Sequence, residues 1–280
     1  MEIRLGNDIV FGGNSIYQIR SPLTGLGTAD IRVGDGVYTG MDGGYVSTEF
    51  YGKRTIVITG FYLTTGCHDY DEARLNLIHA LRIRYLYPIF IKTLGGRYFY
   101  TEGYMTDLKA DITGPKAGEF QVTLVCPDPL IYDGGNGKSP DSAWTEQTFY
   151  KEGHGGFDME YDTPVQWTSG DSITHVNNLG LMPSYPIITL AGTFHSPTIL
   201  NQTNGKFITI ETDTVANDKV VIDMKNRIIT KNGGSIASYR TIDSTWWALE
   251  PGDNKILLQT DSSTDTDFAT IRFRYGYGGI

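Results

Sequence analysis

The residues best suited to chemistry in this sequence are two clusters of potential metal ligands. The segment Cys67–Asp71 offers sulfur, imidazole and carboxylate groups, and 261–267 carries three aspartates that could bind Ca²⁺. Adjacent side chains rarely converge on one ion, and Asp69 and Asp71 suit the start of a helix, where free N–H groups favour carboxylates. The aspartate segment lacks the glycine and the distal glutamate of an EF-hand loop, so a polar hairpin tip is expected there. We therefore predict no metal site.

Catalytic machinery is not evident in the sequence. The motifs of serine hydrolases, zinc proteases, P-loop NTPases and protein kinases do not occur. The stretch Gly25–Gly27 lacks the third glycine and the helix of a dinucleotide-binding loop. No spacing selects a pair of carboxylates for glycoside hydrolysis, so a glycan-cleaving enzyme is the weakest alternative. We predict that the chain is not an enzyme, that it has no catalytic residue and that it binds no cofactor.

Trp246 and Trp247 are the best candidates for a binding role. Successive residues of a strand point to opposite faces, so one indole can fill a core while the other lies on the surface. A surface indole can stack on a sugar ring or anchor a protein interface. The alternative function that stays open is a carbohydrate-binding tail or secreted module that uses these two residues.

Length and composition favour a folded β-rich protein. The 280 residues are 40% hydrophobic and 12% aromatic, with 18 tyrosines, 12 phenylalanines and 34 glycines, which favours strands joined by turns. The net charge is −9, and the acidic carboxyl half of the chain argues against binding to nucleic-acid phosphates or to anionic lipid. No apolar run reaches the length of a membrane span, and the start MEIRLGNDIV does not resemble a secretory signal. We expect no sequence-specific nucleic-acid binding and no membrane insertion.

The two cysteines, Cys67 and Cys126, are too few for a disulfide framework or a four-cysteine zinc site. Cys126 ends a run in which Phe120, Val122 and Leu124 alternate with more polar residues. This period of two predicts that Cys126 lies on the buried face of a strand.

The first half of the sequence predicts strands and one helix. The helix is expected over 70–87, with Asp69 at its N-cap and an end before Pro88. Its expected apolar stripe consists of Leu77, Ile78, Leu81 and Tyr85. The strands are expected at 54–63, 89–93, 97–102, 104–112 and 119–126.

The second half predicts only strands, spaced by about ten residues with turn signals between them. They are expected at 186–190, 206–212, 218–224, 227–231, 255–260 and 268–275. The polar, glycine-rich segment 133–142 has the composition of a linker. The predicted organisation is therefore a β-rich domain with one helix over 1–132, this linker, and a β-sandwich domain over 143–280, in which the aromatic stretch 143–165 has no clear assignment.

In this order of domains, the chain resembles the distal tail proteins of siphophages that infect Gram-positive bacteria. The motifs that carry the resemblance in the first half are Phe11–Tyr17, Leu23–Leu26, Gly40–Gly44, Phe50–Arg54 and Cys126–Tyr132. Those in the second half are Asn178–Pro186, Val220–Lys231 and Thr245–Asn254, which are similar to the galectin-like domain of the family. Each motif consists mostly of residues that are typical of turns, but the order and spacing of the motifs together are specific to the family.

The resemblance implies a structural virion protein that works at the phage tail tip and is assembled in the host cytoplasm. Six copies would form a ring through the first domain, coaxial with the tail tube and open to DNA. The implied partners are the tail tube protein, the tail-associated lysin or tip protein, and receptor-binding or peripheral baseplate proteins carried by the galectin-like domain.

The long glycine-rich segment 23–47 would add little to an isolated core, but such a ring explains it if the segment packs on a neighbouring copy. The expected ring interface includes Gly25, Asp42, Gly43, Gly44 and Arg54. We also expect acidic side chains such as those of Asp30, Asp35 or Asp42 to approach the lumen, where negative charge would let DNA slide.

Overall fold

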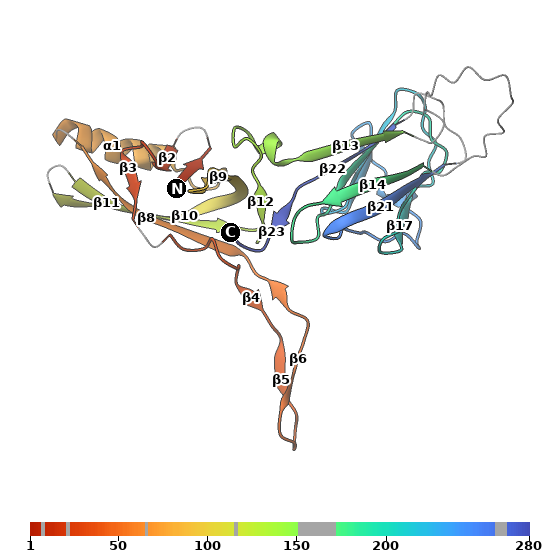
Figure 1. Ribbon diagram of the computed structural model, residues 1–280, viewed down its shortest axis with the longest axis horizontal. Helices are drawn as coiled ribbons and strands as arrows, with labels where there is room; N and C mark the ends of the chain where they lie inside the picture. Colours follow the sequence, from red (N-terminus) through yellow and green to blue (C-terminus); the bar gives the residue numbers. More distant parts are fainter. Residues whose placement is uncertain (7–8, 21–22, 65–66, 115–116, 151–171, 261–267) are drawn as a thin grey trace. The chain divides into compact units, whose positions relative to one another are not determined.

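Two compact units make up the chain in the computed structural model, which describes residues 1–280 except 7–8, 21–22, 65–66, 115–116, 151–171 and 261–267 (Figure 1). Unit 1 contains Met1–Ala143 together with Gly276–Ile280, and unit 2 contains Trp144–Tyr275. Strands predominate in both units, and α1 (Cys67–Ala80) is the one α-helix within the described residues. The predicted mainly β fold with a single helix is confirmed. Neither α1 nor the short 3-10 turns of the described chain are long and apolar enough to span a membrane.

Unit 1 is built on a sheet that closes on itself. The strands follow the order β11-β8-β3-β2-β1-β9-β10, and β10 also pairs with β11, so the circle of strands is complete. Closure removes the unpaired edges at which sheets otherwise associate. Ile3, Ile58 and Val122 are fully buried in the apolar core that the sheet encloses with α1. The strands are β1 (Glu2–Leu5), β2 (Ile9–Gly12), β3 (Tyr17–Ile19), β8 (Arg54–Leu63), β9 (Leu86–Lys92), β10 (Tyr98–Gly114) and β11 (Ala117–Cys126).

The helix α1 begins earlier and ends earlier than the predicted 70–87. Asp69 lies in its first turn rather than at the N-cap. Negative charge in this turn is still favoured by the positive end of the helix dipole. At the other end, the Tyr87 hydroxyl donates a hydrogen bond to the Ala80 carbonyl at 3.1 Å and accepts one from the Arg82 N–H. This side chain from β9 satisfies groups that a further helical turn would have used, so the helix ends at Ala80.

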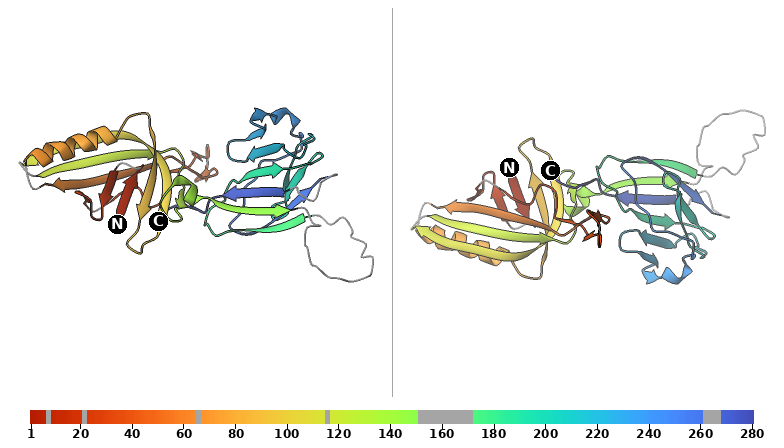
Figure 2. Two further views of the ribbon diagram at one scale, coloured as in Figure 1. Left: turned by 90° about the horizontal axis from the view of Figure 1, so that it is seen from above. Right: turned by 90° about the horizontal axis from the view of Figure 1, so that it is seen from below.

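One face of α1 packs on the closed sheet, along whose long strands it lies in Figure 2. Ala73 and Leu77 are buried there, as is Leu81 directly after the helix, and the Tyr17 hydroxyl donates a hydrogen bond to the Ala73 carbonyl at 2.6 Å. Tyr85, which the predicted stripe included, is 54% exposed because the helix has already ended. The prediction for this residue was wrong.

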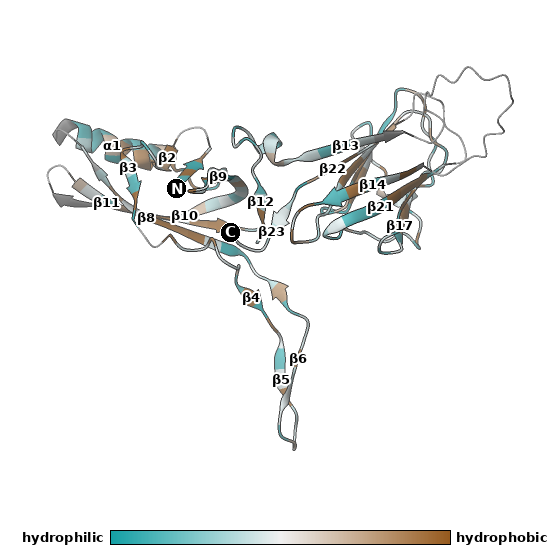
Figure 3. Ribbon diagram, in the orientation of Figure 1, coloured by the Kyte–Doolittle hydropathy of each residue, from teal (hydrophilic) through white to brown (hydrophobic). Residues whose placement is uncertain are grey.

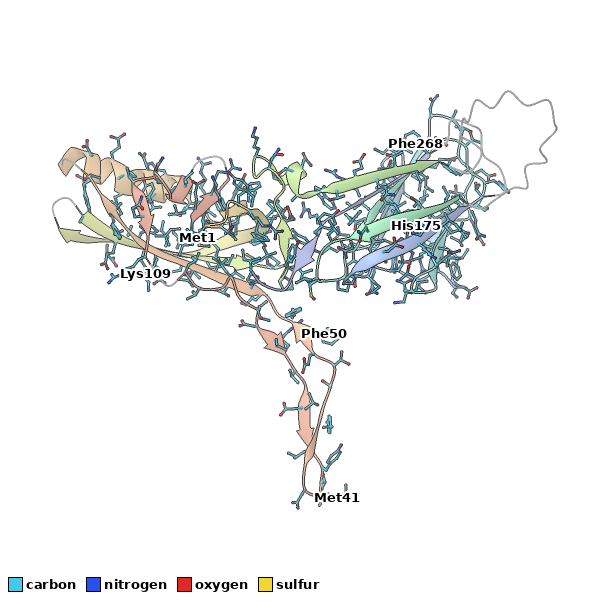
Figure 4. All side chains as sticks on the ribbon, in the orientation of Figure 1. Met1, Met41, Phe50, Lys109, His175 and Phe268 are labelled. Carbon is cyan, nitrogen blue, oxygen red and sulfur yellow. The ribbon has the colours of Figure 1, made fainter. Side chains whose placement is uncertain are left out.

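Between β3 and β8 the chain leaves the closed sheet as a long hairpin, which we call the arm and define as residues 30–52. Near its root β4 (Ile31–Arg32) pairs with β7 (Phe50–Tyr51), and further out β5 (Asp35–Val37) pairs with β6 (Gly44–Val46). The arm extends away from the closed sheet (Figure 1), and Figure 4 shows Met41 at its far end.

The end of the chain returns to unit 1. β23 (Gly276–Tyr277) pairs with β12 (Ile131–Asp133), which itself pairs with β10. The ring of Tyr277 lies edge-on to Phe99, and the Ile280 N–H bonds the Leu26 carbonyl at 2.9 Å. These contacts place 276–280 in unit 1, whereas the predicted second domain ran to 280. The segment predicted as a linker, 133–142, also lies in unit 1 and includes most of a 3-10 turn, η1 (Pro140–Ala143).

Unit 2 consists of two sheets that share one apolar core. Ile199, Ile256 and Leu258 from one sheet, and Ile188 and Ile271 from the other, are buried in the same cluster, and the strands that carry them show hydrophobic colour in Figure 3. Such packing is that of a sandwich, and its galectin-like classification stays a prediction. One sheet contains β13 (Thr145–Tyr150), β22 (Phe268–Phe273), β15 (Ile187–Ala191), β18 (Lys219–Asp223), β19 (Ile228–Lys231) and β20 (Gly234–Ser235). The other contains β14 (Ser172–Asn178), β21 (Gly252–Gln259), β16 (Thr198–Asn201) and β17 (Lys206–Thr209), and a 3-10 turn, η2 (Ala237–Tyr239), follows β20.

Cys126 is fully buried at the end of β11, as the alternating pattern predicted. Burial raises the pKa of its thiol to about 11. Because only a thiolate reacts quickly with disulfide reagents, we expect this thiol to be inert in the folded protein at pH 8. In a Cys67→Ser background, Ellman's reagent should titrate no thiol in buffer and one thiol in denaturant. Rapid reaction in buffer would show that unit 1 is not closed around Cys126.

Candidate assembly surface

Arg54 holds together the segments from which the arm emerges. It begins β8, directly after the arm, and its side chain is buried, with 1% of the residue exposed. Its Nε donates to the Pro129 carbonyl at 2.8 Å, and its Nη2 donates to the Gly278 carbonyl at 2.6 Å. Its Nη1 donates to the carbonyls of Gly25, at 2.7 Å, and of Gly27. One guanidinium thus joins the segment before the arm to the loop that follows β11 and to the last residues of the chain.

Burial lowers the pKa of the Arg54 guanidinium, and the nearby Asp128 partly offsets this effect. A buried cation is tolerated where its hydrogen bonds are satisfied. The four carbonyls supply those bonds. The Arg54 side chain therefore stabilises unit 1 from within and is not exposed for contact with a partner.

Gly25 is required by the same arrangement. Its φ of +90° is a conformation that other residues rarely adopt, and a Cβ atom there would lie 1.9 Å from the Thr55 carbonyl oxygen. The chain before the arm therefore lies so close to the start of β8 that a side chain at this position would not fit. Of the five predicted interface residues, Gly25 and Arg54 fix the root of the arm from inside unit 1.

The other three predicted interface residues lie at the tip of the arm. Asp42, Gly43 and Gly44 are all exposed, and the Tyr38 N–H bonds the Gly43 carbonyl at 3.3 Å across the turn. Gly43 has a φ of +101°. The structure thus separates the predicted residues into a fixed root and a projecting tip.

The arm carries apolar side chains on both of its faces. Cross-strand pairing puts Val37 and Val46 on one face together with Asp35, while the Tyr45 ring lies over Gly36 on the other. Val37 is 84% exposed, and Tyr45 is 54% exposed. Other exposed apolar residues of the arm are Ile31, Val33, Tyr38, Met41, Val46 and Phe50.

An isolated two-stranded hairpin is marginally stable in water, and exposed apolar patches of this kind mark interaction sites. Sequence reasoning missed these apolar side chains because frequent glycines interrupt the strand pattern of the arm. The signal that could have found them is the apolar sequence on either side of the predicted Gly40–Gly44 turn.

The two tryptophans of unit 2 have different environments. Trp247 is 1% exposed and lies in the core, and among the described residues its indole N–H has no acceptor. Trp246 is half-buried against that core, with the Arg240 guanidinium 5.8 Å from its ring centre. Neither lies within a described strand. Of the two predicted platform residues, only Trp246 therefore leaves part of its indole open to solvent.

The described residues contain no group of three metal-ligating side chains close enough to hold an ion. The aspartates of 261–267, and the side chains of Cys67 and His68, lie outside the described part of the chain. His175 contacts Asp253 at 2.8 Å, and His195 contacts Asp213, in two exposed pairs on unit 2. Neither pair has a third metal-ligating side chain beside it among the described residues.

Comparison with known proteins shows likeness to phage tail components. Residues 179–277 match the family described as siphovirus-type tail component, C-terminal domain. The distal tail protein of Bacillus phage SPP1 is 27% identical over 262 residues, which are 89% of this chain and 88% of that protein. The crystal structure of SPP1 Dit, described as a hub of the adsorption apparatus, has the same fold, with a TM-score of 0.64, 17% identity and coverage of 91% and 92%. The family resemblance that the motifs predicted is confirmed.

Replacing Arg54 by Met should destabilise unit 1 by at least about 3 kcal/mol, because four carbonyls would lose their donor. All four tryptophans lie within the span of unit 2. Urea unfolding followed by tryptophan fluorescence should therefore leave unit 2 unchanged, while the circular dichroism transition of unit 1 moves to lower urea. The control is Arg20→Met, which removes an exposed ion pair with Glu119 and should cost less than about 1 kcal/mol. Equal effects of the two substitutions would contradict the role of Arg54.

Proposed function

Because this chain is similar to siphophage distal tail proteins in sequence and in fold, we propose that it forms a hexameric ring at the tip of a phage tail. Unit 1 forms the ring and unit 2 lies outside it. The ring joins the tail tube protein to the tail-associated lysin or tip protein, and its lumen lets DNA pass. The protein acts in the virion as a structural component and not as an enzyme.

The observation that carries this proposal is the arm. It exposes apolar side chains on both faces, it is fixed at its root by Arg54, and it projects from a sheet that is otherwise closed. A hairpin of this kind is stabilised when its faces are covered by another molecule. A second copy of the chain is a partner that is always present during assembly.

A projecting arm favours a ring over a symmetric dimer. The surface that donates the arm differs from the surface that receives it, so each copy can bind one neighbour on each side. Such heterologous contacts close into a ring when the rotation between copies divides the circle. The number six comes from the family resemblance.

The charge of the arm fits a position near DNA without binding it. Residues 30–52 contain four acidic side chains and one arginine, and Asp30, Asp35 and Asp42 are all exposed. We propose that part of this charge faces the lumen, where it repels phosphates. Unit 2 is proposed to carry receptor-binding or peripheral baseplate proteins.

Two substitutions on the arm test this proposal. Val37→Asp and Met41→Asp each place a charge where an apolar side chain, 84% and 70% exposed in the isolated chain, is expected to be buried by a neighbour. We expect association of the chain to weaken at least tenfold, since burying an unpaired carboxylate is costly. Mass photometry across a dilution series, with native mass spectrometry at high concentration, measures the species present.

The matched control is Leu94→Asp, which adds the same charge at a residue that is 91% exposed in the turn between β9 and β10. This variant should associate like the unsubstituted chain, and all three variants should keep its thermal unfolding. A chain that stays monomeric at every concentration would refute the ring, and unchanged association of both arm variants would refute the role of the arm.

A further inference from the structure

Unit 1 contains an open groove that is lined in part by apolar side chains. Its volume is about 730 Å³, and it lies between α1, β2 and the segment 82–87. Ile9, Ile16, Ala80 and Tyr85 give it an apolar wall, and His79 and Arg82 form a polar rim. Ile16 is 49% exposed and Tyr85 is 54% exposed, so the apolar wall is open to solvent.

We propose that this groove receives the β5–β6 end of the arm from a second copy of the chain. The inference rests on the proposed ring and names the surface that completes it. Shape, apolar character and charge favour the arm as the occupant of the groove. Each of these properties follows from residues of the arm and of the groove.

The apolar match lies on one face of the arm. Val37 and Val46 project from the same face of the β5–β6 hairpin and are 84% and 68% exposed. Covering them with the wall at Ile16 and Tyr85 removes apolar surface on both partners from water, which favours association. A hairpin tip is also narrow enough to enter a groove that a whole domain could not.

The charge match lies beside the apolar one. Asp35 shares the face of Val37 and Val46, and the rim of the groove offers Arg82 without an acidic residue among its described lining side chains. An arginine can bind a carboxylate with two parallel hydrogen bonds, so this pair would fix the register of the arm in the groove. Complementary charges also suppress wrong partners.

The arm of one copy does not dock in the groove of the same copy. The helix α1, which forms one wall of the groove, lies on one side of the closed sheet, and the arm leaves on the other (Figure 1). Contact between an arm and a groove therefore joins two copies, and each copy uses both surfaces. This arrangement is heterologous and satisfies the requirement for ring closure.

A cross-linking experiment tests the inference. Two populations of the full chain are prepared in a Cys67→Ser background, one with Val37→Cys and a first tag, the other with Asn76→Cys in the groove wall and a second tag. The buried Cys126 is left in place, because its thiol is protected. The populations are mixed, associated and treated with a short bis-maleimide, and native mass spectrometry reports the assembly before treatment.

We expect covalent pairs that carry both tags. The control pair is Val37→Cys with Leu94→Cys, which offers an equally accessible thiol outside the groove and should give few such pairs. A ring that forms without arm-to-groove pairs would overturn this inference and leave the proposed ring intact. A chain that does not associate would overturn the proposed ring and this inference with it.

Exchange of the two charges supplies an independent test. Arg82→Glu should weaken association roughly tenfold, since it places like charges opposite each other. Asp35→Arg in the same chain should restore it, because every copy supplies both the arm and the groove. Failure of the second substitution to restore association would contradict the proposed pairing of Asp35 with Arg82.

Discussion

A two-stranded hairpin has no interior, and this constraint determines how the apolar side chains of the arm can be buried. Side chains on either face of the arm can be buried only by something else, because two strands cannot cover both faces of each other. Yet Val37, Tyr45 and Val46 are apolar and exposed on those faces. The rest of unit 1 buries its apolar side chains in a closed sheet with one core. The arm is thus a part of unit 1 that a partner would stabilise, and the proposed ring of identical copies would cover every arm.

A projecting hairpin is useful in assembly only if its root is fixed. The closed sheet provides a rigid base, and Arg54 ties the segment before the arm to Pro129 and Gly278 through their carbonyl groups. The second of these contacts makes the last residues of the chain part of that base. Unit 2 is therefore inserted between two portions of unit 1, and its strands take no part in the closed sheet.

Local patterns in the sequence predicted local features well. The β-branched run Arg54–Leu63 became β8 with the expected bounds, and the alternation that ends at Cys126 placed that thiol in the core. Features that depend on distant partners were not predictable. The Tyr87 hydroxyl ends α1 from a neighbouring strand, and β23 joins unit 1 by pairing with a strand more than a hundred residues earlier. Arg54 was expected at the ring interface that the family resemblance implies, whereas four carbonyls from separate segments allow its burial.

The central claim is that a second copy covers the arm, and amide hydrogen exchange of residues 35–46 tests it most directly. In the dilute, unassociated chain these amides should exchange rapidly while those of β8 and β11 stay protected. In the associated chain, exchange over 35–46 should slow at least tenfold, with no change in the β8 and β11 amides. Arm amides that are already protected in the monomer, or that exchange equally fast after association, would contradict the account.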